Sequence, residues 1–381
     1  MPPLPPISGE FRTRGTWGGK MSEGHQPTKT AADYESALNK ADTSVASFEL
    51  EHMTPLQKLR MFLQAYPVAV PIFVLILSVL LFGLTTDGRI FLPGNLSTIL
   101  KQVTPIGIVA IAQTIIILTA GIDLSIGAIM VLSTIVMGKL GVQLGLPEPL
   151  AIAIGLAAGG VMGYVNGVLV TRLRLPPFIV TLGTLYIFQA LKLWYSESES
   201  IRNVDTEATA PLLIFFGNVI SVAGFQILYG TIAFLLLAVI MSYVLKHTAW
   251  GRHVYAVGDD LNGAMLSGVR TDKVLRSVYV VAGVIAAFAG LVLIGRVGGT
   301  ITPLAGETAN LDSITAVVIG GTSLFGGRGS IVGSVLGALI VGVFRFGLSL
   351  SKVDVLWQDF TVGILIIAAV AIDQWIRKAS S

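Results

Sequence analysis

Apolar stretches of membrane-spanning length follow one another along the chain, from Tyr66 almost to the C-terminus. A helix that crosses the hydrocarbon core takes about 20 apolar residues, and on this measure we expect about ten transmembrane helices, with about eight as the lower bound. The predicted spans are residues 66–84, 103–121, 124–143, 149–171, 176–194, 226–245, 277–295, 313–326, 331–350 and 356–374. The pattern predicts an all-α polytopic membrane protein.

Glycine interrupts several of these stretches, and we expect the second, third and eighth to be half-helices or re-entrant segments. The stretch 115–138 has an apolar half, a break at Ala120–Gly127 and a half rich in small residues. The stretch 316–342 repeats this plan around Gly320–Gly333. Paired broken helices point to the substrate path in many transporters, so a path near the two breaks is expected.

Charge predicts the orientation. Ten spans place both termini on one side, and that side carries more of the Lys and Arg residues, whereas the large opposite loop 195–225 is mostly acidic. The positive-inside rule therefore predicts an N-in, C-in topology. Residues 1–60 are polar and hold no apolar run of signal-peptide length, which predicts a disordered cytoplasmic tail ahead of a permease domain at 61–378. Met21 and Met53 offer alternative starts for that tail.

Composition excludes several classes of protein. Only 12% of the 381 residues are charged and 53% are hydrophobic, against about 25% charged in an average soluble domain. The net charge of +3 is explained by cytoplasmic anchoring charge, so no nucleic acid partner is expected. The chain has no cysteine, and none of its four histidines lies in an apolar stretch. We therefore expect no metal site and no catalytic residues in this chain. Gly326–Ser330 lacks the lysine of a phosphate-binding loop, so this chain is expected to bind no cofactor.

Asp123 is the polar residue that most needs an explanation, because an ionised carboxylate in hydrocarbon is costly. Gly121 and Gly127 beside it can open the backbone, and Ser125 can form a hydrogen bond. One interpretation places Asp123 and Ser125 on a substrate path. A second makes Asp123 an ordinary helix cap, and a third makes it a carrier of coupled protons. The residues alone leave all three open.

A second polar group precedes the eighth predicted span, on the predicted outer side. It consists of Glu307, Asn310, Asp312, Ser313 and Thr315. These side chains could contact a hydroxylated solute at a re-entrant mouth, or Asp312 or Ser313 could cap the next helix. Gln113 and Asn166 lie within predicted spans, where hydrogen bonds between helices are the expected role. All of them are candidate pathway residues.

The longest loop between spans on the predicted inner side is 246–276, and basic residues flank its centre. Within Ala256–Val269, an Asp- and Asn-rich start and the terminator Gly268 leave room for about two turns of helix. Such a helix could fit a groove on a partner, whereas the alternative is a plain basic loop that sets topology. The candidate docking residues are Gly258, Asp259, Asp260, Asn262, Ala264, Met265, Ser267 and Gly268.

Two stripes of glycine indicate close helix packing. Gly159, Gly163 and Gly167 recur every four residues, as do Gly329, Gly333 and Gly337. Small residues let helices approach closely in lipid. Each stripe could serve a dimer face, but packing inside one subunit is the preferred interpretation.

Four segments resemble the permeases of bacterial ATP-binding-cassette sugar importers, the class that handles ribose, xylose, galactose and fructose. They are Leu118–Gly127, Leu175–Gly183, Thr248–Asp260 and Thr315–Ser330, and the resemblance extends over residues 60–378. It is strongest to fructose-import permeases, through Thr248–Asp260 and Ala369–Lys378. Thr181, in the second segment, joins the candidate pathway residues. Gly263 departs from the usual Ala or Glu, and Gly disfavours helix by about 1 kcal/mol, which weakens the predicted docking helix.

What the resemblance implies is an importer in the bacterial inner membrane. It would contain two permease copies surrounded by membrane lipids, a dimer of cytosolic ATP-binding subunits and a periplasmic sugar-binding protein. ATP and Mg would be bound by the ATPase, and the helix near Asp259–Gly268 would transmit its motion to the spans. Alternating access would then carry the sugar inward, with specificity mostly in the binding protein.

Two other hypotheses remain. The first is an ion-coupled secondary sugar transporter that uses Asp123 and needs no ATPase. The second is a membrane enzyme or lipid flippase, against which the lack of His and Asp catalytic pairs and the small inner loops argue.

Overall fold

The computed structural model describes residues 68–306 and 308–377. The predicted tail at 1–60 and the question of its start lie outside these residues. Seven of the described helices are long and apolar enough to cross a membrane. They are α4 (Pro93–Leu118), α5 with its π-helical extension η3 (Ile126–Gln143), α6 (Glu148–Arg172), α7 (Pro177–Ser196), α9 (Tyr229–His247), α12 (Thr271–Arg296) and α14 (Ile331–Leu350).

Three further helices have apolar stretches shorter than those of the seven: α3 (Ala69–Thr85), α13 (Ala309–Ile319) and α15 (Val355–Arg377). These ten apolar helices correspond one for one to the ten predicted segments, but length and apolar character support seven spans, so a count of about ten stays a prediction. The predicted extent of the eighth segment, 313–326, is wrong. Helix α13 ends at Ile319, because the glycine-rich residues that follow leave helical geometry.

The all-α prediction needs a correction in the large loop 195–225. This region holds α8 (Asn203–Thr209), the 3₁₀ helix η4 (Pro211–Gly217) and an antiparallel hairpin of β1 (Val219–Val222) and β2 (Phe225–Leu228). Ala223 and Gly224 join the strands with φ of 50° and 82°, the left-handed pair that tight hairpins require. Residues 226–228, predicted as the start of a span, are therefore strand. Another 3₁₀ turn, η2 (Arg89–Phe91), links α3 to α4.

Both glycine stripes pack against other segments of the same chain, which is the interpretation that we preferred from the sequence. A Cβ on Gly159 or Gly163 would overlap the backbone of Gly283 and Tyr279 in α12, so α6 and α12 touch along their main chains. A Cβ on Gly333 would likewise overlap Gly320, at the end of α13. The close approach that these glycines allow is used within one subunit.

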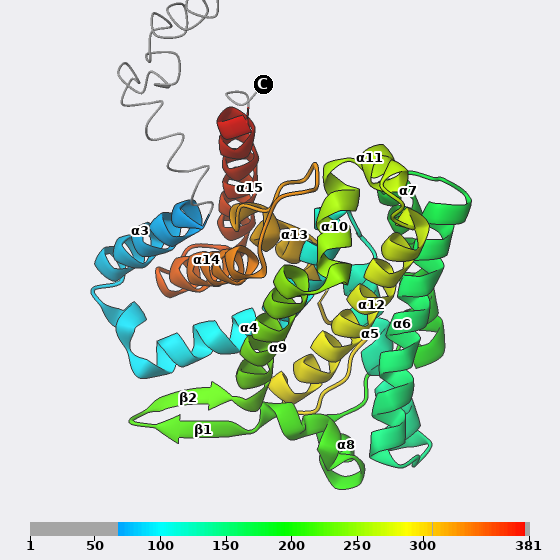
Figure 1. Ribbon diagram of the computed structural model, residues 1–381. Helices are drawn as coiled ribbons and strands as arrows, with labels where there is room; N and C mark the ends of the chain where they lie inside the picture. Colours follow the sequence, from blue (N-terminus) through cyan, green and yellow to red (C-terminus); the bar gives the residue numbers. More distant parts are fainter. Residues whose placement is uncertain (1–67, 307, 378–381) are drawn as a thin grey trace, which may run out of the picture. The chain divides into compact units, whose positions relative to one another are not determined.

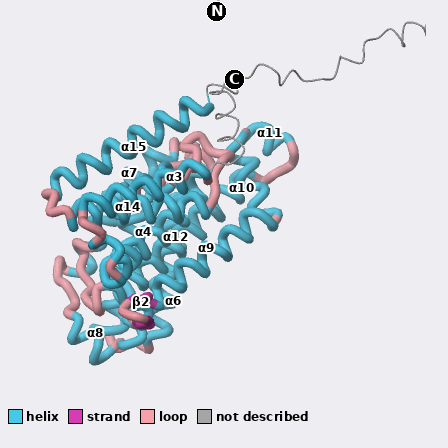
Figure 2. The backbone as a smooth tube through the Cα atoms, turned by 90° about the vertical axis from the view of Figure 1, so that its left-hand side faces the viewer, coloured by secondary structure: helices cyan, strands magenta, loops and turns pink. Residues whose placement is uncertain are grey.

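The helical bundle has two distinct ends. The hairpin and α8 lie at one end, and the short helices α10 (Ala249–Asp259) and α11 (Leu261–Leu266) lie at the other (Figures 1 and 2). Helices α4, α5 and α12 are mostly buried and form the centre of the core.

Candidate functional site

The first break in the helical core is residues 119–125, between α4 and α5. Three side chains satisfy its backbone. In the amide orientation that suits both partners, Gln113 donates to the Asp123 carbonyl and accepts from the Asp123 N–H, each at 3.2 Å. The Thr181 hydroxyl lies 3.0 Å from the Ile122 carbonyl, and Asn310 Nδ2 donates to the Leu124 carbonyl at 3.2 Å. Side chains from α4, α7 and α13 thus replace the helical hydrogen bonds that the break removes.

The Asp123 carboxylate lies inside this arrangement and is 1% exposed. Its Oδ1 accepts from the backbone N–H and the hydroxyl of Ser125, both at 2.7 Å, and its Oδ2 accepts from Asn166 Nδ2 at 3.3 Å. These bonds offset part of the cost of burying the group. Helix α5 begins at Ile126, and the Asp123 carboxylate accepts from the Ser125 N–H just before it, so the interpretation of Asp123 as a helix cap stays open beside the pathway interpretation. The same bond closes a turn over residues 123–125.

Six of the predicted pathway residues are therefore brought together around the first break: Gln113, Asp123, Ser125, Asn166, Thr181 and Asn310. All six are buried, and each bonds to the break or to a neighbour in the group. Ser313 and Thr315 are not part of the group, since their hydroxyls donate to carbonyls of their own helix, at 2.8 and 2.7 Å. Glu307 lies outside the described residues. A contact of any of them with substrate stays a prediction.

Asp312 belongs to a different environment. Helix α13 begins at Ala309 after Thr308, so Asp312 and Ser313 lie inside its first turns and do not cap it. The Asp312 carboxylate accepts from Arg345 of α14 at 2.7 Å and from the Thr308 hydroxyl at 2.9 Å. With its side chain 6% exposed, Asp312 forms a largely buried ion pair that ties α13 to α14.

A cavity of about 260 Å³ opens beside Asp312. Its polar lining comes from Gln102, Arg296, Thr308 and Asp312, and its apolar lining includes Met130 and Leu293. Sequence reasoning missed the first three of these residues. Gln102 lies ahead of the predicted span at 103–121, and Arg296 follows an apolar stretch, where an arginine is usually an interfacial anchor. The composition of this cavity suits a small hydroxylated molecule.

The second break is residues 320–330, between α13 and α14. Gly321, Gly326 and Gly327 have φ of 81°, 85° and 69°, a conformation that side-chain-bearing residues rarely adopt. The Ser323 N–H donates to the Arg328 carbonyl at 2.9 Å, which closes the loop on itself. The Gly327 N–H donates to the Leu118 carbonyl at 3.0 Å, at the end of α4. The two breaks, separated by about half the chain, are thus joined directly through their backbones.

The end of α10 meets the same point. A Cβ on Gly258 would overlap the Leu118 carbonyl and the Gly327 nitrogen, and a Cβ on Gly326 would overlap Gly258 and Ala120. We call these five residues, Leu118, Ala120, Gly258, Gly326 and Gly327, the glycine junction. It joins both breaks to the loop 246–276 without an intervening side chain.

A side-chain bond lies next to the glycine junction. The Tyr255 hydroxyl, on α10, donates to the Gly329 carbonyl at 2.9 Å. Burial raises the pKa of the Tyr255 phenol above its usual value, so the hydroxyl keeps the proton that this bond needs. Farther along the loop, Trp250 Nε1 donates to the Ser277 hydroxyl of α12 at 2.8 Å. Helix α10 is therefore held to the core at both ends.

The predicted docking helix is present as two pieces. Gly258 and Asp259 end α10, and Asp260 is extended and accepts from the Asn262 N–H at 2.9 Å as the N-cap of α11. Helix α11 holds Asn262, Ala264 and Met265, followed by Ser267 as its C-cap. Gly268 has φ of 84°, as expected of a terminator. Leu261 and Leu266 on α11 are 48% and 87% exposed.

Comparison with known proteins identifies the family. The model of the family described as the permease component of branched-chain amino acid transport systems matches residues 95–370. The chain belongs to this permease family. With its series of apolar helices it is an integral membrane protein and a transport subunit rather than an enzyme.

Individual relatives agree with the resemblance to sugar-import permeases, which is confirmed. The chain is 50% identical over 361 residues to the fructose import permease protein FrcC of Rhizobium meliloti, covering 95% of this chain and 100% of that protein. It is 38% identical over 299 residues to the ribose import permease protein RbsC of Bacillus subtilis, covering 76% and 86%. It is 36% identical over 307 residues to the D-allose transport system permease protein AlsC of Escherichia coli, covering 80% and 91%. No solved structure matches the chain.

Proposed function

We propose that this permease is the membrane subunit of an ATP-binding-cassette importer. It moves a monosaccharide, fructose or a related pentose or hexose, from the periplasm to the cytoplasm by alternating access. The names of its relatives, which import fructose, ribose and allose, support the substrate class. The observation that carries the mechanism is the glycine junction, which joins the loop 246–276 to both helix breaks.

The glycine junction suits the transmission of force. Backbone atoms of Leu118, Gly258 and Gly327 are in direct contact, and close-packed contacts of this kind transmit displacement with little loss. A movement of α10 therefore reaches the second break directly at Gly327, beside Leu118 at the end of α4. Alternating access needs a link of this kind, because motion at the loop 246–276 has to reach the broken helices.

The exposed apolar residues of α11 supply the docking surface. Leu261, Met265 and Leu266 stand out from the end of the bundle, and an apolar helix face of this kind fits a groove on a partner. In our proposal the partner is a dimer of cytosolic ATP-binding subunits. Those subunits bind ATP and Mg, and this chain binds no cofactor. A periplasmic sugar-binding protein delivers substrate at the end that carries the hairpin and α8.

The proposed topology counts α3, α13 and α15 with the seven longer helices, ten in all, with α13 and residues 320–330 together forming one broken crossing. The N-terminus, the C-terminus and the loop 246–276 face the cytoplasm of a bacterial inner membrane. The placement of α10 and α11 opposite the hairpin supports this orientation (Figure 2). Two copies of the permease, surrounded by membrane lipids, form the path.

The cavity beside Asp312 is the proposed sugar contact on that path. Arginine, amide, hydroxyl and carboxylate groups hydrogen-bond to sugar hydroxyls, and Met130 and Leu293 offer apolar surface to the ring. Replacing Arg296 with Met should raise the sugar concentration needed for half-maximal transport. Arg174→Met, at an exposed position between α6 and α7, is the control and should leave transport unchanged. Equal transport by both variants would remove this cavity from the path.

Co-purification tests the function as a whole. The tagged permease is extracted in mild detergent and its stoichiometric partners are identified by mass spectrometry. We expect an ATPase, whose activity rises when a sugar-loaded binding protein is added to the reconstituted complex. Transport by the permease alone, driven by a proton gradient, would establish the alternative, an ion-coupled transporter that uses Asp123. A protonophore distinguishes the two, because only the ion-coupled transporter stops when it is added.

A further inference from the structure

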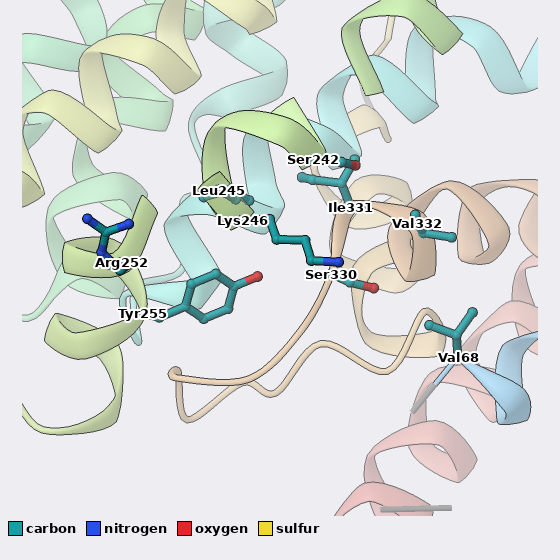
Figure 3. A pocket seen from close by; sticks show the side chains of 9 residues that line it. All are labelled: Val68, Ser242, Leu245, Lys246, Arg252, Tyr255, Ser330, Ile331 and Val332. Atoms are coloured by element: carbon teal, nitrogen blue, oxygen red, sulfur yellow. The ribbon is translucent and has the colours of Figure 1, made fainter. Parts of the chain in front are cut away.

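A further cavity among the described residues lies apart from the cavity beside Asp312 and borders the second helix break at Ser330. It has a volume of about 630 Å³ and opens where the end of α9, helix α10 and the start of α14 come together. Val68, just ahead of α3, closes one side. Figure 3 shows Lys246 reaching across the cavity toward Ser330, with the Tyr255 hydroxyl turned to the same space and Arg252 at the edge.

The charge of this cavity is one-sided. Among the described residues that line it, Lys246 and Arg252 are the only ionisable side chains apart from Tyr255, and none is acidic. Neither cation forms an ion pair with any residue that the structure describes. The Ser242 and Ser330 hydroxyls remain able to donate a hydrogen bond, because Ser330 acts only as an acceptor, from the Gly333 N–H. Two cations and two hydroxyl donors are the chemistry that binds a phosphate group.

The surface that leads away from the cavity is apolar. On α9, Leu235, Val239, Ser242 and Lys246 are spaced as one helical stripe, and the first two are 51% and 67% exposed. The stripe is polar at the end that carries α10 and apolar along the rest of the span. On α14, Val332 is exposed, and Leu336 and Leu339, at the same helical spacing, are half-buried. A ligand with a charged head and long apolar chains matches this distribution.

We propose that this cavity binds the headgroup of an anionic phospholipid. The phosphate lies beside Lys246 and the Ser330 hydroxyl, with Arg252 at the edge of the cavity, and the acyl chains follow the apolar stripe of α9 that begins at Val239. Basic pockets between helices at the cytoplasmic face are typical sites for such lipids. Since Tyr255 both lines the cavity and bonds to Gly329, the bound lipid lies directly behind the glycine junction and braces α10 against the start of α14.

Native mass spectrometry of the full-length permease tests the site without depending on the transport assay. Delipidated protein is titrated with dioleoyl phosphatidylglycerol and with the zwitterionic dioleoyl phosphatidylcholine. We expect one phosphatidylglycerol per chain to be retained in preference to phosphatidylcholine. The double variant Lys246→Gln, Arg252→Gln should bind phosphatidylglycerol about 10- to 30-fold more weakly, because each basic residue near a membrane surface contributes about 1 kcal/mol.

The matched control is Arg270→Gln, Lys273→Gln, which removes the same charges from the same loop at residues that do not line the cavity. It should bind phosphatidylglycerol like the wild type. Thermal unfolding provides a second readout, since a bound lipid raises the midpoint in the wild type and the control but not in the cavity variant. Equal binding by all three proteins, or equal retention of phosphatidylcholine, overturns the proposal. Full displacement of the lipid by millimolar inorganic phosphate would also overturn it, by showing a site for free phosphate.

Discussion

Both helix breaks leave backbone groups without helical hydrogen bonds, and the two breaks satisfy those groups in different ways. Residues 119–125 are held by side chains from other helices, with Gln113, Asn166 and Thr181 bonded to the break or to the Asp123 carboxylate. Residues 320–330 are held mainly by their own backbone, with glycines in left-handed conformations and the Leu118 carbonyl at the end of α4 as partner. The first break depends on polar side chains and the second on the absence of side chains.

This difference suggests a division of roles. Buried polar networks hold a single geometry, because a displaced member leaves unpaired groups in a dry interior. A glycine-rich loop can change conformation at lower cost. The second break also contacts α10, where a partner would act. We therefore expect the first break to be a fixed support and the second to be the moving part.

The largest effect should come from Gly258→Ala, which inserts a methyl group where Leu118 and Gly327 meet. Overpacking a dense contact costs about 1–3 kcal/mol, and the overlap with backbone atoms here favours the upper end. Transport and thermal stability should both fall. Gly183→Ala, where a Cβ would meet nothing, is the control and should not weaken the protein. Normal transport by Gly258→Ala would show that the glycine junction transmits nothing.

Asp123→Leu should have the next largest effect. It removes the acceptor for three hydrogen bonds and leaves the Asn166 amide and the Ser125 N–H without that partner, at a cost of about 1–3 kcal/mol. The thermal midpoint in detergent should drop accordingly. The isosteric Asp123→Asn is the informative companion. If it keeps its midpoint but loses all transport, Asp123 carries protons and the first break is not merely a support.

Gly321→Ala tests the second break away from the glycine junction. With φ of 81°, an added side chain strains the backbone by roughly 1–2 kcal/mol. If the second break keeps one conformation during transport, Gly321→Ala should lower stability only. A moving loop should instead show a larger loss in transport rate than in thermal midpoint. Equal, small effects on both would place the second break with the first as a static support. Gly88→Ala, with φ of 75° in the loop before α4, is the control for strain alone.

Thr181→Val should have the smallest effect. The Thr181 hydroxyl lies near both the Ile122 carbonyl at 3.0 Å and the Pro177 carbonyl at 2.9 Å, so its proton is shared. Losing one such bond should lower stability by about 1 kcal/mol and leave transport intact. Thr184→Val, whose hydroxyl bonds only within α7, is a suitable comparison. A strong transport defect in Thr181→Val alone would support its prediction as a pathway residue.

The amino-acid sequence by itself determined the membrane class, the approximate position of every apolar helix and the position of both breaks. These properties are local, since an apolar run of sufficient length forms a helix in lipid and a glycine cluster interrupts it. The hairpin was missed for a related reason. The short run Phe225–Leu228 adjoins an apolar span, and periodicity cannot separate a strand from a helix end over four residues.

Tertiary structure decided how these parts meet. Nothing in the pattern around Leu118, Gly258 or Gly327 indicates that their backbones touch, because the contact depends on how three helices dock. The same holds for Asp312, whose partner Arg345 lies on the next helix, and for Lys246 and Arg252, which share a cavity with the start of α14. Local sequence sets where a helix begins and ends, whereas contacts between distant segments arise only when packing places them within a few ångströms of each other.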